Sequence, residues 1–150
     1  MTTLFEARNP AFAERVRASL SDQPLMSALL GAAATRIEPG YVDIELALRP
    51  DFLQPHGNAH GVILSALADS ATGYAAQTLM PATHDVVTVE YKINYLAPAF
   101  GERIVARGQV MRPGRTLYVC AADVFALTAD KEKLVAHMVA TLMAVATDHA

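Results

Sequence analysis

The sequence predicts an α+β domain in which one apolar helix packs against a mostly antiparallel sheet of five or six strands. Three observations predict this class. Residues 59–80 are apolar on nearly every side of a helix and contain a single charge, Asp69, which indicates a helix inside a core. Most segments that alternate apolar and polar residues follow this helix. Turn sequences such as Pro113-Gly114-Arg115 separate those segments and favour hairpins.

Two short helices are expected ahead of the sheet. Asn9-Pro10 suits the start of the first helix, with proline at the first helical position, and the second is expected after Pro24. The apolar residues of these two helices are Phe12, Val16 and Leu20 in the first and Leu25, Leu29 and Leu30 in the second. We expect both helices to be structural and to pack these residues onto the larger body of the protein.

The expected strands cover residues 41–48, 86–96, 103–111, 117–126 and 134–145, after a first strand-like segment that ends at the turn Glu38-Pro39-Gly40. In the strand at 86–96, strict alternation assigns Val87, Val89, Tyr91, Ile93 and Tyr95 to one face and Thr88, Glu90, Lys92 and Asn94 to the other. Thr88 is therefore expected to point away from the helix, unless a bulge or a strand end turns it.

Charge and composition narrow the function classes. The net charge is -3 and the basic residues are scattered, so there is no basic footprint for nucleic acid. The single cysteine, Cys120, allows no intramolecular disulfide, and its position within an apolar strand favours an inert packed thiol. The N-terminus lacks an apolar signal segment, and polar residues interrupt the apolar helix. We expect a soluble cytoplasmic protein that neither spans a membrane nor binds nucleic acid.

Two features of the helix could carry chemistry. The first turn, at Gly61 and Val62, has backbone N–H groups without intrahelical partners, which can polarise a carbonyl. Asp69 is a costly charge on so apolar a helix, although a satisfied core aspartate is the alternative. Eight residues separate Gly61 from Asp69, or ~12 Å along the axis. One reacting carbon could therefore meet both groups only if they come from two subunits.

The loop before the helix supplies further candidates. Gln54 and Asn58 are neutral groups that could hold a water or a carbonyl, or satisfy the loop itself. His56 and His60 are four residues apart, but the proline and glycines around them and the missing further ligands disfavour zinc. His60 is expected at the helix cap. No metal or other cofactor is expected, and no G-x-S-x-G elbow occurs.

Two segments resemble one known family. His60-Gly61 followed by Leu67-Ala68-Asp69-Ser70-Ala71, together with the run from Thr88 to Pro98 (TVEYKINYLAP), is similar to the hotdog-fold acyl-CoA thioesterases of the PaaI, or phenylacetate-degradation, type. The order of elements agrees over residues 33–147. The resemblance implies a single hotdog domain over 1–150, in which an antiparallel sheet wraps around one long central helix. Its N-terminal helical segment would cover 1–31 and its core 32–147.

The resemblance also implies roles for individual residues. Gly61 matches the glycine whose N–H polarises the thioester carbonyl, and Asp69 the acid that acts from the other subunit as nucleophile or general base. Gln54 matches an amide that positions carbonyl or water, His60 a structural support, and Thr88 a hydroxyl near the attacking water. Family members form homodimers with antiparallel helices, which often pair into tetramers. Val62 departs from the family, which usually has a second glycine there, and its β-branched side chain narrows the approach.

The hypothesis is hydrolysis of an acyl-CoA thioester, with the acyl group in an apolar groove between subunits. Arg112 and Arg115, which flank a turn, are the candidates for the nucleotide phosphates. Two alternatives remain. Hotdog folds also serve hydro-lyases such as enoyl-CoA hydratases, which need a histidine facing the helix acid, and a non-catalytic module could bind acyl-CoA or another apolar ligand.

Overall fold

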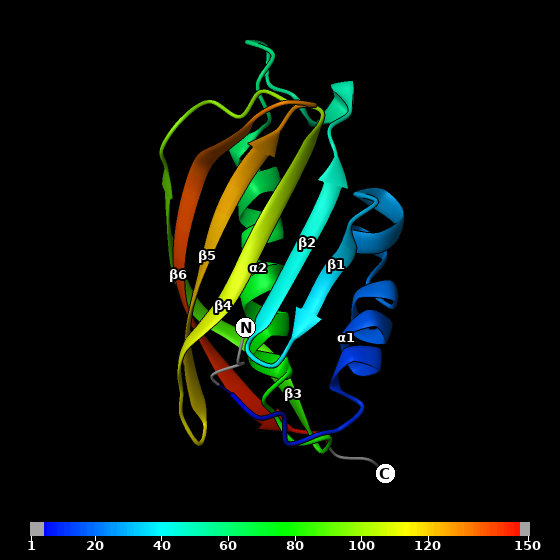
Figure 1. The fold of residues 1–150 in the computed structure, drawn as a ribbon, viewed down its shortest axis with the longest axis vertical. Coiled ribbons are helices and arrows are strands. Elements are labelled where there is room, and N and C mark those ends of the chain that lie inside the picture. The colour runs from blue at the N-terminus through cyan, green and yellow to red at the C-terminus, as the bar shows by residue number, and fades with distance from the viewer. Residues whose placement is uncertain (1–4, 148–150) are drawn as a thin grey trace.

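The computed structural model describes residues 5–147 as one six-stranded antiparallel sheet that curves around a central helix, α2 (Gly61–Gln77) (Figure 1). The strands are β1 (Ala33–Glu38), β2 (Tyr41–Ala47), β3 (His84–Tyr95), β4 (Arg103–Pro113), β5 (Leu117–Leu127) and β6 (Glu132–Ala146). Their order across the sheet is β1-β2-β4-β5-β6-β3, so β1 and β3 are its two edges. The predicted α+β class, the central helix and the antiparallel strands are confirmed.

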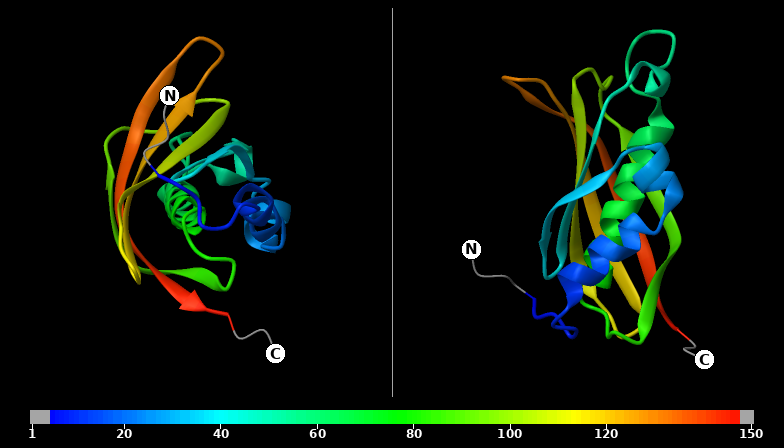
Figure 2. Two further views of the ribbon diagram at one scale, coloured as in Figure 1. Left: turned by 60° about the horizontal axis from the view of Figure 1, so that its bottom comes forward. Right: turned by 90° about the vertical axis from the view of Figure 1, so that its right-hand side faces the viewer.

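Helix α2 lies against the concave face of the sheet, which wraps around it when the molecule is viewed nearly end-on (Figure 2). Most of its seventeen residues are buried, as the unbroken apolar run requires. The closest approach is to β4, where a Cβ added to Gly108 would lie 2.3 Å from the Ala71 carbonyl oxygen. No helix within residues 5–147 is long and apolar enough to span a bilayer, α2 included.

The N-terminal helices pack beside β1 and α2 and only partly match the prediction (Figure 2). In α1 (Phe12–Ser21), Val16 and Leu20 are buried, as predicted. The next segment, η1 (Leu25–Leu29), is a single π-type turn that is capped by Pro24. The prediction is wrong for Leu25 and Leu29, which are 57% and 59% exposed, and is confirmed for Leu30, which is buried. Met26 and Leu30, also four residues apart, take the inward side, and the sequence pattern alone could not choose between these two faces.

A bulge in β3 changes which residues face the helix. Thr88 pairs with Leu142 and Glu90 with the next residue, Thr141, so Val89 has no partner on β6. The alternation therefore shifts by one residue at this point. Thr88 shares the inward face with the buried Leu142, and Tyr91, Ile93 and Tyr95 are inward beyond the bulge. The expectation that Val87 shares a face with Tyr91 is wrong, and the bulge turns Thr88 toward the helix.

The remaining connections position the two ends of α2. The 3-10 turn η2 (Pro50–Phe52) and the loop after it lead into the helix at the same end of the sheet as the end of β3 (Figure 1). Gly57 has a φ of +86° in this loop, a conformation that favours glycine. At the other end, the β4–β5 hairpin carries Arg112 and Arg115.

Candidate active site

A cavity of about 390 Å³ opens at the N-terminal end of α2. It is lined by Gln54, Asn58, Ala59, Gly61, Leu64, Tyr95, Leu96, Ala97, Pro98 and Ala99. None of these lining side chains is charged. The polar groups at its wall are the two amides, the Gly61 backbone and the Tyr95 hydroxyl. Such a cavity suits an uncharged group that is mainly apolar and carries one or two hydrogen-bonding atoms.

The first turn of α2 leaves one backbone donor open toward this cavity. His60 is the N-cap residue, with an extended backbone (φ -63°, ψ 136°), and its Nδ1 accepts a hydrogen bond from the Val62 N–H at 3.3 Å. The His60 carbonyl accepts from the Ile63 N–H at 3.0 Å. Within residues 5–147 the Gly61 N–H has no acceptor. It is therefore an oriented donor at the positive end of the helix dipole.

Tyr95, at the end of β3, packs directly on Gly61. Its hydroxyl donates to the Gly61 carbonyl at 3.0 Å and lies 2.6 Å from the Ser65 Oγ. A Cβ at position 61 would stand 3.0 Å from the tyrosine ring, tighter than most Cβ contacts, so another residue there would make the ring shift by a few tenths of an ångström. Alternation along the strand predicts that Tyr95 faces inward but indicates no role for it at the site. Alternation shows the face of a residue and not its height along the helix.

Asp69 lies two turns further along α2, where it is half-buried. The Thr88 hydroxyl donates to its Oδ1 at 2.8 Å, a contact that exists because the β3 bulge turns Thr88 inward. The other oxygen, Oδ2, has no hydrogen-bond donor among residues 5–147, and Asp69 forms no ion pair with any of them. The carboxylate is thus held by one oxygen while the second remains available to a water or a substrate.

The other predicted site residues fall into two groups. Gln54 and Asn58 line the cavity, in a tight turn where the Gln54 N–H donates to the Asn58 carbonyl at 2.9 Å. Val62 does not line the cavity and is 61% exposed. The β4–β5 hairpin, which carries Arg112 and Arg115, lies at the opposite end of the sheet from the start of α2 (Figure 1). The cavity therefore gathers the Gly61 N–H and the two amides, and Asp69 lies about 12 Å further along the helix.

Cys120 and His56 stand apart from this chemistry. Cys120 is fully buried in β5, and burial raises the pKa of its thiol to about 12, which confirms an inert packed thiol. His56 is exposed in the loop. Among the residues that the structure describes, no group of three or more potential metal ligands comes together.

Comparison with known proteins agrees with the fold. The sequence profile of the thioesterase superfamily matches residues 56–132, which include Gly61, Asp69 and Thr88. A curated protein of Saccharolobus solfataricus with esterase in its name is 33% identical over 90 residues. This match covers 60% of the present chain and 64% of that protein, so it spans less than two thirds of the relative's length.

Solved structures extend the comparison to nearly the whole chain. A thioesterase family protein from Silicibacter pomeroyi is 43% identical and superimposes with a TM-score of 0.88, covering 91% of this chain and 99% of that one. The PaaI protein of E. coli, from the phenylacetic acid degradation operon, is 20% identical with a TM-score of 0.81, covering 93% and 96% of the two chains. At that identity the likeness concerns the fold alone. The chain belongs to the thioesterase superfamily and has its hotdog fold.

Proposed function

We propose that this protein hydrolyses an acyl-CoA thioester to the free acid and CoA. One observation carries the proposal: a single helix presents an unpartnered N–H at an uncharged cavity and, two turns later, a carboxylate with one open oxygen. The first group suits a developing oxyanion and the second suits activation of a nucleophile. The single buried thiol of Cys120 suits a reducing compartment, and we place the enzyme in the cytoplasm.

In the proposed reaction the thioester oxygen accepts the Gly61 N–H, and the acyl group occupies the cavity. Asp69 of the partner subunit takes a proton from a water as that water attacks the carbonyl carbon. Alternatively Asp69 attacks the carbon itself, and after the thiolate has left, a water hydrolyses the acyl-aspartate anhydride to the free acid and regenerates the carboxylate. The tetrahedral intermediate collapses with loss of the CoA thiolate, which is then protonated to the thiol. Thr88 would hold the carboxylate in line, and Gln54 and Asn58 would position the carbonyl or the water.

The separation of Gly61 from Asp69 makes a homodimer part of this proposal. About 12 Å is too far for both to act on one carbon in one chain, whereas two antiparallel α2 helices would bring each Gly61 to the partner's Asp69. Arg112 and Arg115 lie at the far end of the sheet, so in such a dimer the partner's hairpin approaches the cavity end. There the two arginines would bind CoA phosphates. We expect such dimers to pair into tetramers.

Each of the two alternative functions has a requirement or a readout that distinguishes it from hydrolysis. A hydro-lyase needs a histidine facing Asp69, but the His60 Nδ1 is occupied by the Val62 N–H and His56 is exposed in the loop. A non-catalytic acyl-CoA module would bind without turnover. It would show a ligand-induced rise in melting temperature and no thiol release.

The test is a panel of acyl-CoA thioesters with thiol release followed by a chromogenic disulfide reagent. Asp69→Asn is compared with Asp130→Asn, the same chemical change at an exposed turn residue. We expect the wild type and Asp130→Asn to release thiol equally, and Asp69→Asn to lose about 100-fold or more in kcat. Equal turnover by Asp69→Asn and the wild type would end the proposal. Hydration of an enoyl-CoA without thiol release would select the hydro-lyase instead.

A further inference from the structure

Two side-chain hydroxyl groups meet at the Gly61 carbonyl. The Tyr95 hydroxyl lies 3.0 Å from this oxygen, the Ser65 Oγ lies 3.2 Å from it, and the two hydroxyl oxygens lie 2.6 Å apart. Two hydroxyl hydrogens serve these three contacts. Tyr95 and Ser65 therefore act as one cluster, in addition to the helical hydrogen bond that the Gly61 carbonyl accepts from the Ser65 N–H at the start of α2.

This cluster completes the fixation of the two peptide groups that flank the Gly61 Cα. The peptide after Gly61 is held at its oxygen by the hydroxyl cluster and at its nitrogen by the His60 Nδ1. The peptide before it is held at its oxygen by the Ile63 N–H. Glycine is the residue with the greatest backbone freedom, so an N–H on glycine keeps one direction only if its neighbours hold it.

Tyr95 also packs closely against position 61. A Cβ there would stand 3.0 Å from the tyrosine ring, which would have to shift to admit it. The ring also forms part of the cavity wall and is exposed to it. Tyr95 thus offers two separable contributions, a hydroxyl that holds the backbone and a ring that borders the bound group.

We propose that Tyr95, with Ser65, is the positioning residue for the oxyanion-binding Gly61 N–H, and that its ring sets the fit of the acyl group. This inference rests on the proposed thioester hydrolysis. The hydroxyl acts on kcat, because it orients a donor whose bond to the oxygen strengthens as negative charge develops. The ring acts on KM, because it contacts a part of the substrate that does not react.

The kinetic test compares Tyr95→Phe, Ser65→Ala and the double variant with Tyr41→Phe, a matched removal of a hydroxyl that borders no part of the cavity. We expect Tyr95→Phe to lower kcat about tenfold, with KM within about twofold of the wild type. Ser65→Ala should have a smaller effect of the same kind, and the two losses should not add, since both belong to one cluster. Tyr95→Leu, which also removes the ring, should raise KM.

A second measurement reports on the N–H without any activity. The only His-Gly pairs in the sequence are His56-Gly57 and His60-Gly61, so labelling with [¹³C′]histidine and [¹⁵N]glycine isolates two amide signals. Gly57→Asn assigns them by removing one. In Tyr95→Phe the Gly61 signal should shift and exchange with water faster, whereas the Gly57 signal should stay in place, because its N–H donates to the Gln54 carbonyl.

The possible results test the positioning role, its effect on catalysis and the proposed function separately. An unmoved Gly61 signal in Tyr95→Phe overturns the positioning role whatever the kinetics show. A moved signal with unchanged kcat shows that the orientation of this N–H does not limit the reaction, and it overturns the catalytic part of the inference. A wild type without thiol release on any acyl-CoA defeats the proposed function instead, and the amide signals then decide alone whether Tyr95 fixes Gly61.

Discussion

Thr88 shows how one residue depends on an irregularity of its strand. Its hydroxyl donates to the Asp69 Oδ1 at 2.8 Å only because Val89 is left unpaired in β3. A donor to one carboxylate oxygen fixes the direction of the other, which the proposed reaction uses. We predict that Thr88→Val, of nearly equal volume, lowers kcat for thiol release about tenfold, the effect of one hydrogen bond to a charged group. Thr88→Ser should retain most of the activity, and equal rates for Val and Ser would contradict this role.

Cys120 gives a prediction that also supports the activity assay. Burial raises the pKa of its thiol to about 12 and leaves none of its surface exposed. The reactive thiolate is therefore about one part in 10⁴ at pH 8. We predict no reaction of the native protein with a disulfide reagent over an assay, and one thiol per chain in guanidinium. Rapid titration of one thiol in the native protein would contradict the packing of β5.

At the scale of the elements, the contact between α2 and β4 sets the position of the central helix. A Cβ at Gly108 would lie 2.3 Å from the Ala71 carbonyl oxygen, so Gly108→Ala must push the helix off the sheet. A Cβ at Gly73, inside α2, meets nothing nearer than the Val86 Cγ1 at 4.0 Å. We predict that Gly108→Ala lowers the free energy of unfolding by about 1–3 kcal/mol, whereas Gly73→Ala raises it by about 0.5–1 kcal/mol.

Urea denaturation at one fixed protein concentration measures both changes, since association also contributes to stability. The two variants make the same chemical change on facing elements and are expected to move the midpoint in opposite directions. A Gly108→Ala midpoint equal to that of the wild type would show that the helix can shift without cost.

The sequence predicts elements better than it predicts their irregularities. The apolar run at 59–80 and the alternating segments after it carry enough pattern to place a central helix and its sheet. Alternation is a local rule, however, and nothing in residues 86–95 marks the bulge at Val89 that reverses it. For the same reason the pattern singles out Gly61 and Asp69 but misses Tyr95. Its contact with Gly61 depends on how far β3 runs along α2, which is a property of the packed structure.

At the scale of the whole molecule, β3 is an open edge of twelve residues that a second copy can extend. Its exposed apolar residues include Val89 at 53% and Tyr91 at 43%, an unprotected edge of the kind that pairs with another strand. Two copies related by a two-fold axis would pair antiparallel, each residue facing the same side as its partner. The proposed reaction needs two chains, and this edge is where we expect them to meet.

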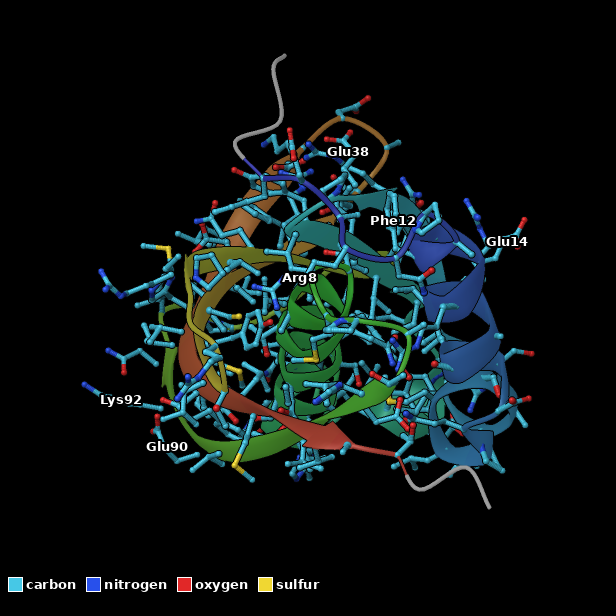
Figure 3. All side chains as sticks on the ribbon, turned by 90° about the horizontal axis from the view of Figure 1, so that it is seen from below. Arg8, Phe12, Glu14, Glu38, Glu90 and Lys92 are labelled. Carbon is cyan, nitrogen blue, oxygen red and sulfur yellow. The ribbon has the colours of Figure 1, made fainter. Side chains whose placement is uncertain are left out.

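The charges on β3 select one register for this pairing. Glu90 and Lys92 both project from the outer face of the sheet (Figure 3). An axis through Glu90 or through Lys92 would place like charges opposite each other. An axis through Tyr91 places each Glu90 opposite the partner's Lys92, so the interface contains two pairs of opposite charges.

The same register would bring the two halves of the active site together. In this register Lys92 faces the partner's Glu90. The partner's Val89 is the unpaired bulge residue, so the next residue, Ile93, faces the partner's Thr88. Ile93 is the inward-facing residue next to Tyr95 on β3. Thr88 holds Asp69 and Tyr95 touches Gly61. The partner's carboxylate is thereby brought toward the donor that it must face across the thioester.

We therefore predict that Lys92→Glu raises the dissociation constant of the dimer about tenfold. The interface would then contain two pairs of like charges, and each pair would cost about 0.5 kcal/mol or more of binding free energy. Thiol release should fall with dilution at higher protein concentrations than in the wild type. The double variant Glu90→Lys, Lys92→Glu exchanges the two charges and should recover most of the affinity. Recovery should be incomplete, because this variant also loses the 2.5 Å hydrogen bond that Glu90 accepts from Thr141. Sedimentation over a range of concentrations measures this, with Lys131→Glu, at the exposed turn before β6, as the control. If the exchanged variant dissociates as readily as Lys92→Glu alone, these two residues do not face each other, and another register or another surface joins the subunits.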